Sequence, residues 1–334
     1  MVLIAGWDGE AQVKVAGVDV RLFRARALPG LGFSGLVSAG LQSALQHHVR
    51  EFDVVHIHLG RHLIALAAAG ACRRHQVPYV LQTHGMVIED ARPQARVADT
   101  LAVRRTLRNA SAVLALTDEE ESSLSSVSRG EARVIRIRNG VAPVTDAGGH
   151  ARAGAPEVLF LARLHPRKRV MAFAEAAAML HDRGISARFS VVGPDEGDLD
   201  RLLAFMSARA DLPLSYDGPV APGHSVRRLA AADVYVLPSV REVFPMTVLE
   251  SISVGTPVVL TEDCGIAHEL AEAGAAVIST GTAADIAGAV ESILSSATRR
   301  HALAEGMRKS LAEDFGIATV AAALLSIYAD RSVA

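Results

Sequence analysis

The sequence has few of the residues that build cross-links, aromatic clusters or membrane spans. It contains two cysteines, three lysines and only 4% aromatic residues among 334. Cys72 and Cys264 lie far apart without metal-ligand spacing, which argues against a disulfide scaffold and indicates a reducing compartment. The longest apolar stretch, residues 63–72, is too short to span a bilayer. The N-terminus has no basic segment followed by an apolar core, so we expect no signal peptide and a cytoplasmic protein.

The remaining composition is that of an ordinary α/β protein. Half of the residues are apolar, and 27 glycines and 13 prolines provide turns. A chain of this length exceeds what one hydrophobic core usually supports, so we expect two domains. Residues 1–150 hold 17 Lys and Arg against 14 Asp and Glu, and the rest holds 17 against 22. A mildly basic first half fits an anionic membrane surface or a phosphorylated acceptor, but simple scatter over two solvated surfaces is favoured because the excess is small.

Short apolar runs alternate with longer helical stretches, which is typical of parallel βαβ units. In the first half the predicted strands are Val18–Phe23, Val54–Ile57, Tyr79–Gln82, Ala112–Ala115 and Val134–Ile137. In the second half they are Val158–Leu161, Phe189–Val192, Val234–Leu237, Val258–Leu260 and Ala275–Ile278.

The run Ala142–Pro156, rich in Ala, Gly and Pro, predicts an interdomain linker. We therefore expect two doubly wound Rossmann-like domains facing a cleft, with ligands at the carboxyl ends of the strands. The first covers residues 1–145 and the second covers 155–315, and a last helix within 316–334 packs back on the first. Thr117 to Glu120 form a capping box that opens a helix. The chain opens on a short strand and a polar stretch, residues 8–14, so the first domain is expected to lack its opening βα unit.

A basic cluster follows the first predicted strand of the second domain. Arg163 stands at the carboxyl end of that strand, and Lys168 stands on the turn beyond it. A guanidinium fork and a compact ammonium could together neutralise the oxygens of a diphosphate. The alternative is a solvated basic loop, a common composition on protein surfaces.

A second cluster follows the predicted strand Val234–Leu237. We expect Pro245 to be the first residue of a helix, so that the free N–H groups of Met246 and Thr247 form an anion site. Glu250, a little more than one turn further on, could accept hydrogen bonds from a ribose diol. Glu242, in the preceding loop, could accept them from sugar hydroxyls. The alternative is that both are surface carboxylates near a helix start.

Together the two clusters resemble the family-four retaining glycosyltransferases of GT-B fold, also called glycosyltransferases group 1. That family carries the elements Gly-Arg-Leu-x-x-x-Lys-Gly and Glu-x-Phe-Gly-x-x-x-x-Glu, followed by Ala-x-x-x-Gly-x-Pro-Val-Val. The matching positions here are Arg163 with Lys168, Glu242 with Glu250, and Ser251–Val259. Further matches are Phe52–His58, Pro78 with Tyr79, Thr83–Gly85, Arg138–Val141, Cys264–Ile266 and Glu269, so the resemblance covers about residues 50 to 290.

The resemblance implies a role for each matched residue. Arg163 and Lys168 would bind the diphosphate of a nucleotide-sugar donor, and Glu250 would bind its ribose. Glu242 and His84 would contact the transferred sugar, and the backbone of Phe244–Thr247 would complete the site. In this family the donor phosphate oxygen is thought to help deprotonate the acceptor, so catalysis rests on positioning and on stabilising the departing diphosphate. No metal or other cofactor is implied, because the cations and the helix N-terminus take the place of a metal.

Some residues depart from the family pattern. Ala162 and Arg169 stand where the family usually has Gly, and Pro245 replaces the Gly that follows Phe. The family's first strand and Gly-rich loop have no evident counterpart here.

Two further patterns suggest other ligands. Gly30 to Gly35 match the dinucleotide fingerprint, but Pro29 and an Arg-rich preceding strand favour a plain loop. His56, His58 and His62 could include metal ligands, but no Cys or carboxylate pattern completes the set, so a hydrogen-bonded pair is favoured.

The sequence thus predicts a retaining glycosyltransferase of the hexosyltransferase type. It would use a UDP- or GDP-linked sugar and a saccharide or lipid-linked acceptor, in bacterial cell-envelope polysaccharide or glycolipid synthesis. We expect no nucleic-acid partner and leave open peripheral contact with the inner face of the membrane. One alternative is a truncated, non-catalytic nucleotide-sugar-binding or scaffold protein of the same fold. Another is a GT-B epimerase or hydrolase, which would need an acid/base set beyond His84 and Glu242.

Overall fold

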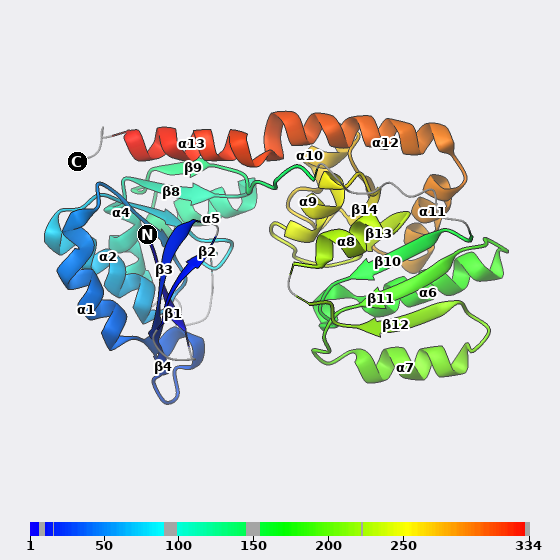
Figure 1. The fold of residues 1–334 in the computed structure, drawn as a ribbon, viewed down its shortest axis with the longest axis horizontal. Helices are drawn as coiled ribbons and strands as arrows, with labels where there is room; N and C mark the ends of the chain where they lie inside the picture. The colour runs from blue at the N-terminus through cyan, green and yellow to red at the C-terminus, as the bar shows by residue number, and fades with distance from the viewer. Residues whose placement is uncertain (7–10, 16, 90–98, 145–153, 222, 331–334) are drawn as a thin grey trace. The chain divides into compact units, whose positions relative to one another are not determined.

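The computed structural model describes residues 1–6, 11–15, 17–89, 99–144, 154–221 and 223–330. The chain divides into two compact units (Figure 1). Unit 1 comprises residues 1–137 and 323–334, and unit 2 comprises residues 138–322. Much of the predicted linker Ala142–Pro156 lies outside the described residues.

Unit 2 is built on a six-stranded parallel sheet in the order β12-β11-β10-β13-β14-β15. The chain begins at the centre with β10, moves outward to β12, returns to β13 beside β10, and moves outward again to β15. This is the doubly wound arrangement that the sequence predicts. The strands are β10 (Glu157–Leu161), β11 (Arg188–Val192), β12 (Leu214–Gly218), β13 (Val234–Leu237), β14 (Val258–Thr261) and β15 (Val277–Ser279). Of these, β12 was not predicted, and β15 begins two residues later than expected.

Helices cover the sheet of unit 2 and bury its strands. They are α6 (Val170–Asp182), α7 (Leu199–Ala208), α8 (Ser225–Ala230), α9 (Met246–Ser253), α10 (Ala267–Glu272), α11 (Ala283–Leu294) and α12 (Ala297–Ser310), with the short turns η4 (Pro166–Lys168) and η5 (Leu311–Phe315). Helix α6 packs beside α11, and α8 packs beside α9. Every residue of β10, β13 and β14 is buried, which explains why these strands are nearly continuous apolar runs.

Unit 1 contains a four-stranded parallel sheet in the order β6-β7-β8-β9. Its strands are β6 (Val55–His58), β7 (Tyr79–Gln82), β8 (Ala112–Ala115) and β9 (Val134–Arg136), and its helical segments are α1 (Ala39–His48), η2 (Val49–Glu51), α2 (Leu63–His75), η3 (Asp99–Val103), α4 (Arg104–Arg108) and α5 (Asp118–Ser128). The predicted bounds of β7 and β8 are confirmed. One half of the predicted capping box is confirmed, because the Thr117 hydroxyl accepts from the Glu120 N–H, 3.2 Å away, at the start of α5. The Glu120 carboxylate accepts from the N–H of Leu116, the residue before the N-cap.

The first residues form a separate three-stranded sheet with the order β1-β3-β2, made of β1 (Val2–Gly6), β2 (Ala11–Val15) and β3 (Val18–Arg24). Residues 8–14 were expected to be a polar stretch, and no strand was predicted there. Residues 11–15 nevertheless form β2, which pairs antiparallel with β3. Strand β1 pairs parallel with β3, and no α-helix precedes Ala39 in the described part of the chain. The opening βα unit is thus replaced by a strand that leads into a hairpin. Five aliphatic side chains of this sheet are exposed: Val2, Ile4, Val13, Val15 and Val18.

Helix α13 (Ile317–Ala329) is the last helix of the chain, and its final turns belong to unit 1. There the Tyr328 hydroxyl lies 2.5 Å from His56 Nδ1, and Arg133 pairs with Asp330 at 2.7 Å. Among the helices that the structure describes, none combines the length and the apolar character that crossing a bilayer requires.

Candidate functional site

The site predicted from sequence lies where the strand order of unit 2 reverses. Strands β10 and β13 are neighbours at the centre of the sheet, and the connections that follow them run in opposite directions. Ligands of open α/β sheets bind at such a switch point, outside the carboxyl ends of the strands. The loop after β10 carries Arg163 and Lys168, and the loop after β13 carries Glu242 and leads into α9.

The structure brings the two loops into direct contact. Lys168 Nζ lies 2.5 Å from Glu242 Oε2, and the two side chains are only 16% and 18% exposed. The Val240 N–H donates to Arg167 O at 2.9 Å, and the Arg167 guanidinium donates to Arg241 O. A cation and a carboxylate that are 74 positions apart thus form one half-buried pair.

Arg163 points away from the sheet and reaches a carboxylate that the sequence did not single out. Its Nη1 lies 2.8 and 2.7 Å from the two oxygens of Glu196, in the loop after β11. The Arg163 side chain is 61% exposed, and an ion pair so open to water contributes little free energy. A phosphate could therefore displace Glu196 at small cost. Glu196 could have been identified from the sequence by its position shortly after the carboxyl end of the predicted strand Phe189–Val192.

Helix α9 presents its N-terminus at this end of the sheet. Pro245 is its N-cap, with a φ of −77°, and Met246 is the first helical residue, so the prediction that Pro245 begins the helix is wrong by one position. The reason is the extended ψ of 111° at Pro245. Pro245 has no side-chain group that could cap this helix, and no side chain of the described residues is seen to do so, which leaves the N-terminal dipole available to an anion. Thr247 is fixed in place, because its Oγ1 lies 2.9 Å from the buried Tyr235 hydroxyl.

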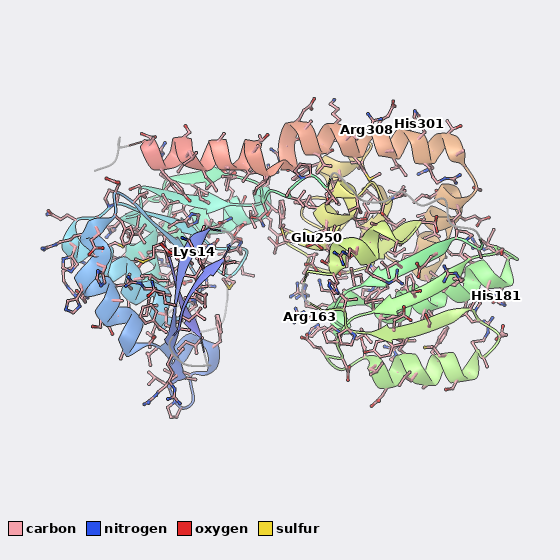
Figure 2. All side chains as sticks on the ribbon, viewed as in Figure 1. Lys14, Arg163, His181, Glu250, His301 and Arg308 are labelled. Atoms are coloured by element: carbon pink, nitrogen blue, oxygen red, sulfur yellow. The ribbon has the colours of Figure 1, made fainter. Side chains whose placement is uncertain are left out.

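Glu250 lies in the second turn of α9 and carries an unsatisfied oxygen. Its Oε2 is buried and has no hydrogen-bond partner among the described residues. Burying a carboxylate oxygen without a donor costs free energy, so such a group is typical of a site that receives donors from a ligand. Figure 2 labels Glu250 and Arg163, which come from the segments that follow β13 and β10.

The segment from Cys264 to Glu269 runs from the end of β14 into α10 and lies beside Glu242. Cys264 forms a parallel bridge with Glu242, and the Gly265 N–H donates to Glu242 O at 2.8 Å. Glu269 does not point to a free surface, because its Oε2 accepts from Arg138 Nε at 2.9 Å. The backbone of Glu242 is therefore held by the segment that follows β14, while its carboxylate faces Lys168.

The positions that depart from the family pattern have simple structural explanations. Arg169 adopts the left-handed conformation, with a φ of +54°, which glycine adopts without strain. Ala162 is half-buried, and its backbone carbonyl faces Gly193. A Cβ on Gly193 would come within 1.8 Å of Ala162 O. The close approach of β10 and β11 thus requires glycine at position 193.

In unit 1 the predicted sugar-contacting residue, His84, lies just beyond the end of β7. Its Nε2 lies 2.7 Å from His58 Nδ1, at the end of the neighbouring strand β6. Burial lowers the pKa of His58 and of His84 below 6.5. Burial, together with His58 and His84, lowers the pKa of His56 to about 4. In the described part of the chain, no group of three or more His, Cys, Asp or Glu side chains is placed to hold a metal ion.

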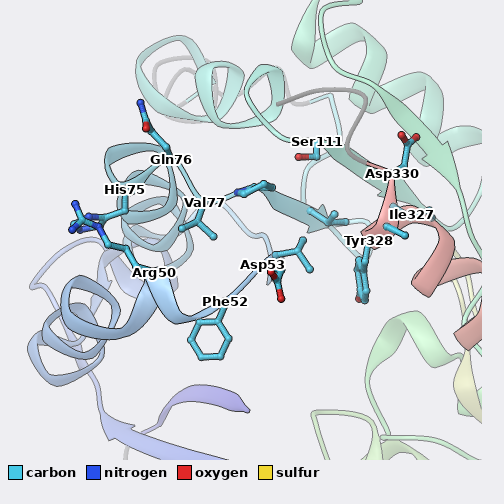
Figure 3. Close-up of a pocket in the computed structure, with 14 residues that line it drawn as sticks. Arg50, Phe52, Asp53, His75, Gln76, Val77, Ser111, Ile327, Tyr328 and Asp330 are labelled. Carbon is cyan, nitrogen blue, oxygen red and sulfur yellow. The ribbon is translucent and has the colours of Figure 1, made fainter.

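A pocket in unit 1 lies beside the segments that lead into β6, β7 and β8 (Figure 3). It has a volume of about 450 Å³, and Asp53, Pro78, Ser111 and Tyr328 are among its lining residues. Asp53, Pro78 and Ser111 precede β6, β7 and β8, so the pocket opens at the amino ends of the strands, where ligands of parallel sheets seldom bind. The segment Gly30–Gly35 also lacks a dinucleotide site, since it spans a hairpin between β4 (Arg26–Ala27) and β5 (Leu36–Val37) with the short turn η1 (Gly32–Gly35).

Comparison with known proteins identifies relatives for both units. Residues 149–310 match the family model "Glycosyl transferases group 1", and residues 1–140 match "Glycosyl transferase 4-like domain". The 2-deoxystreptamine glucosyltransferase of Streptomyces kanamyceticus is 26% identical, over 98% of this chain and 93% of the relative. The D-inositol 3-phosphate glycosyltransferase of Streptosporangium roseum is 28% identical, over 90% and 74%. The structure of Anabaena HepE in complex with UDP superimposes with a TM-score of 0.74 at 19% identity, covering 92% of this chain and 85% of that one.

Proposed function

The chain belongs to the glycosyltransferases of group 1, and from this premise we propose that it transfers a hexose, with retention, from a nucleotide diphosphate sugar to a saccharide or lipid-linked acceptor. Its relatives include enzymes of bacterial glycan synthesis, such as the putative teichuronic acid biosynthesis glycosyltransferase of Bacillus subtilis. We place the acceptor in cell-envelope polysaccharide or glycolipid synthesis on the cytoplasmic side of the membrane, with peripheral membrane contact.

One observation carries the proposed donor site: the Oε2 of Glu250 is buried and has no partner in the described part of the chain. It lies on a helix whose N-cap, Pro245, makes no side-chain cap. A nucleotide diphosphate offers two hydroxyl donors on its ribose and an anion beside them. The ribose would donate to Glu250, and the diphosphate would lie against the N–H groups of Met246 and Thr247. Arg163 and Lys168 would supply the countercharge, releasing Glu196 and Glu242 from their present pairs.

The chemistry follows from these contacts. The bond between the anomeric carbon and the diphosphate oxygen breaks, and the acceptor oxygen bonds to the same face of that carbon. The acceptor proton passes to the departing diphosphate oxygen. Lys168, Arg163 and the N-terminus of α9 would stabilise the negative charge that develops there, which is usually the largest contribution to catalysis. Glu242, freed from Lys168, would accept from hydroxyls of the transferred sugar, and His84 would contact the same sugar from unit 1. In this scheme no metal or other cofactor takes part.

The nucleobase is proposed by similarity. HepE has been solved with UDP and with UDP-glucose, which supports a UDP-linked donor. A GDP-linked donor is the alternative, and the test below includes both.

The experiment is a thermal-shift and transfer assay with a panel of UDP- and GDP-linked hexoses. We expect one donor to raise the melting temperature selectively, because a ligand of the native state stabilises it. With a saccharide acceptor, NMR of the product should show the same anomeric configuration as the donor. Inversion of configuration would contradict the retaining mechanism, and the absence of any shift would contradict the donor site.

A second candidate is a nucleotide-sugar-binding protein without transferase activity. It is favoured by one observation, that β1 leads into the β2–β3 hairpin, so the Gly-rich loop of the family has no counterpart among the described residues. The two candidates differ in outcome. The enzyme shows both a donor-induced shift and product, whereas the binding protein shows the shift with no product for any acceptor.

A further inference from the structure

The turn that carries His84 has an unusual backbone. His84 and Gly85 both lie in the left-handed region, with φ values of +49° and +73°, and the Met86 N–H closes the turn on Thr83 O at 2.8 Å. A histidine seldom adopts this conformation, and it persists only where the surroundings impose it. The contacts on either side of His84 show what imposes it.

Those contacts converge on one buried carboxylate, Glu120, which is 1% exposed. Its Oε1 accepts from the Thr83 hydroxyl and, at 2.5 Å, from the Gly85 N–H. Its Oε2 accepts from the Leu116 N–H at 2.8 Å. Glu120 therefore joins the end of β7 to the end of β8 and accepts a hydrogen bond from the residue on each side of His84.

This use of Glu120 goes beyond helix capping. In a capping box the glutamate at the third helical position reaches back to the N–H of the N-cap residue. Here one oxygen reaches the residue before the N-cap, Leu116, and the other leaves the helix altogether for the turn at His84. If Glu120 only capped α5, its Oε1 would make no hydrogen bond with the turn at His84.

The imidazole of His84 is held by a second residue. His58 Nδ1 lies 2.7 Å from His84 Nε2, and the two rings are nearly parallel, at 16°. Between two neutral imidazoles, one nitrogen of this pair donates and the other accepts, so the tautomer of His84 is coupled to that of His58 and the ring of His84 is held in place. With Nε2 occupied, Nδ1 is the nitrogen that His84 can offer to a ligand.

We propose that Glu120 and His58 are positioning residues for His84, with Glu120 fixing the turn and His58 fixing the ring so that Nδ1 is presented to the transferred sugar. This inference rests on the proposed function, in which His84 contacts that sugar. Neither positioning residue needs to touch the substrate itself.

The test uses two matched substitutions of buried threonines in the full chain. Thr83→Val removes one contact of Glu120, and Thr106→Val makes the same change at a threonine that is 1% exposed and hydrogen-bonded to Arg73. Both should lower the melting temperature by a few degrees. Only Thr83→Val should lower kcat, by about tenfold, since small misplacements of a catalytic group are costly. The affinity for UDP should remain that of the parent, because the proposed nucleotide contacts lie in unit 2.

The ring is tested by ¹⁵N NMR of the His84 nitrogens. His58→Leu should shift the His84 Nε2 resonance, because it removes the hydrogen-bond partner of that nitrogen. His58→Asn, which retains a polar nitrogen near the position of Nδ1, should restore much of the parent spectrum and of kcat. Equal kcat for the two threonine variants, or an unchanged Nε2 resonance in His58→Leu, overturns the proposal. If no donor supports transfer, the proposed function fails instead, and the NMR comparison still decides whether His58 holds His84.

Discussion

Lys168 and Glu242 neutralise each other across the switch point of unit 2, with Nζ 2.5 Å from Oε2. A diphosphate that takes Lys168 must therefore break this pair, and the liberated Glu242 becomes an acceptor for sugar hydroxyls. The pair links binding of the anion to exposure of the carboxylate. The same contact makes each residue a sensitive site for substitution.

We predict that Lys168→Ala weakens donor binding by about 30-fold, the effect of losing about 2 kcal/mol from a charged hydrogen bond. The donor-induced rise in melting temperature should shrink accordingly. Lys309→Ala, an exposed lysine on α12, is the matched control and should keep the full rise. Equal donor responses in the two variants would remove Lys168 from the site.

Glu250→Met should have opposite effects on stability and on binding. Removing a buried carboxylate oxygen without a partner should raise the free energy of unfolding by about 1 kcal/mol in the absence of ligand. Binding of UDP should weaken at least about tenfold, at about 1.4 kcal/mol per tenfold. Calorimetry with UDP and 2′-deoxy-UDP provides the sharper test, because the parent should prefer the ribonucleotide and the variant should not. Glu272→Met, at an exposed position on α10, should change neither property.

Gly193→Ala should cost more than about 3 kcal/mol of unfolding free energy, because its Cβ would lie 1.8 Å from Ala162 O. The control is Gly197→Ala, which also has a positive φ, of +118°, but meets no atom within 4 Å. That change should cost only about 1 to 3 kcal/mol of backbone strain. Urea denaturation of both variants separates the clash from the strain, and similar losses would argue against the close approach of β10 and β11.

Arg169→Gly should stabilise the protein by about 1 kcal/mol, since its φ of +54° strains any residue with a Cβ. Arg129→Gly, at the left-handed C-cap of α5 with a φ of +60°, should give a similar gain far from the donor loops. Thermal unfolding of both variants measures the effect. A loss of stability in Arg169→Gly alone would show that its side chain contributes more than its backbone costs.

The half-buried His56 should make the free energy of unfolding fall as the pH falls. Its pKa is about 4 in the folded protein against 6.5 when exposed, so the unfolded chain binds more protons between these values. The free energy of unfolding should therefore decrease as pH falls from about 6.5 to about 4, by at most about 3 kcal/mol from this residue. His56→Asn should flatten that slope in urea titrations at several pH values. His301→Asn, on an exposed face of α12, should leave it unchanged.

The central strands could be predicted from the sequence because both of their faces are covered. Strands such as β8 and β13 are uninterrupted apolar runs in which every residue is buried. The missed strands are exposed ones. In β2, Gln12 and Lys14 alternate with valines, and β12 ends in Asp217 and Gly218, so each looks like a loop. A strand with one solvated face has too few apolar residues to be distinguished locally from a turn.

The residues proposed to bind the donor could be predicted because their spacing within each loop is local. Arg163 with Lys168, and Glu242 with Glu250, can be found without any tertiary information. The partners of these residues could not be predicted from the sequence. The contact between Arg163 and Glu196 depends on pairing between β10 and β11 that continues past the strand ends. The hydrogen bonds of Glu120 to the turn at His84 depend on the register of β7 with β8. Such contacts join positions tens of residues apart and leave no periodic signal.

The division of the chain has a consequence for how such proteins diversify. All residues proposed to recognise the nucleotide lie between positions 163 and 250, within unit 2, whereas His84 and its positioning residues lie within unit 1. The chain passes between the units near residues 137 and 322. Recombination at these two points would exchange one unit while leaving the other intact. Under the proposed function, nucleotide recognition would then be inherited with unit 2, whereas the contact of His84 with the transferred sugar would be inherited with unit 1.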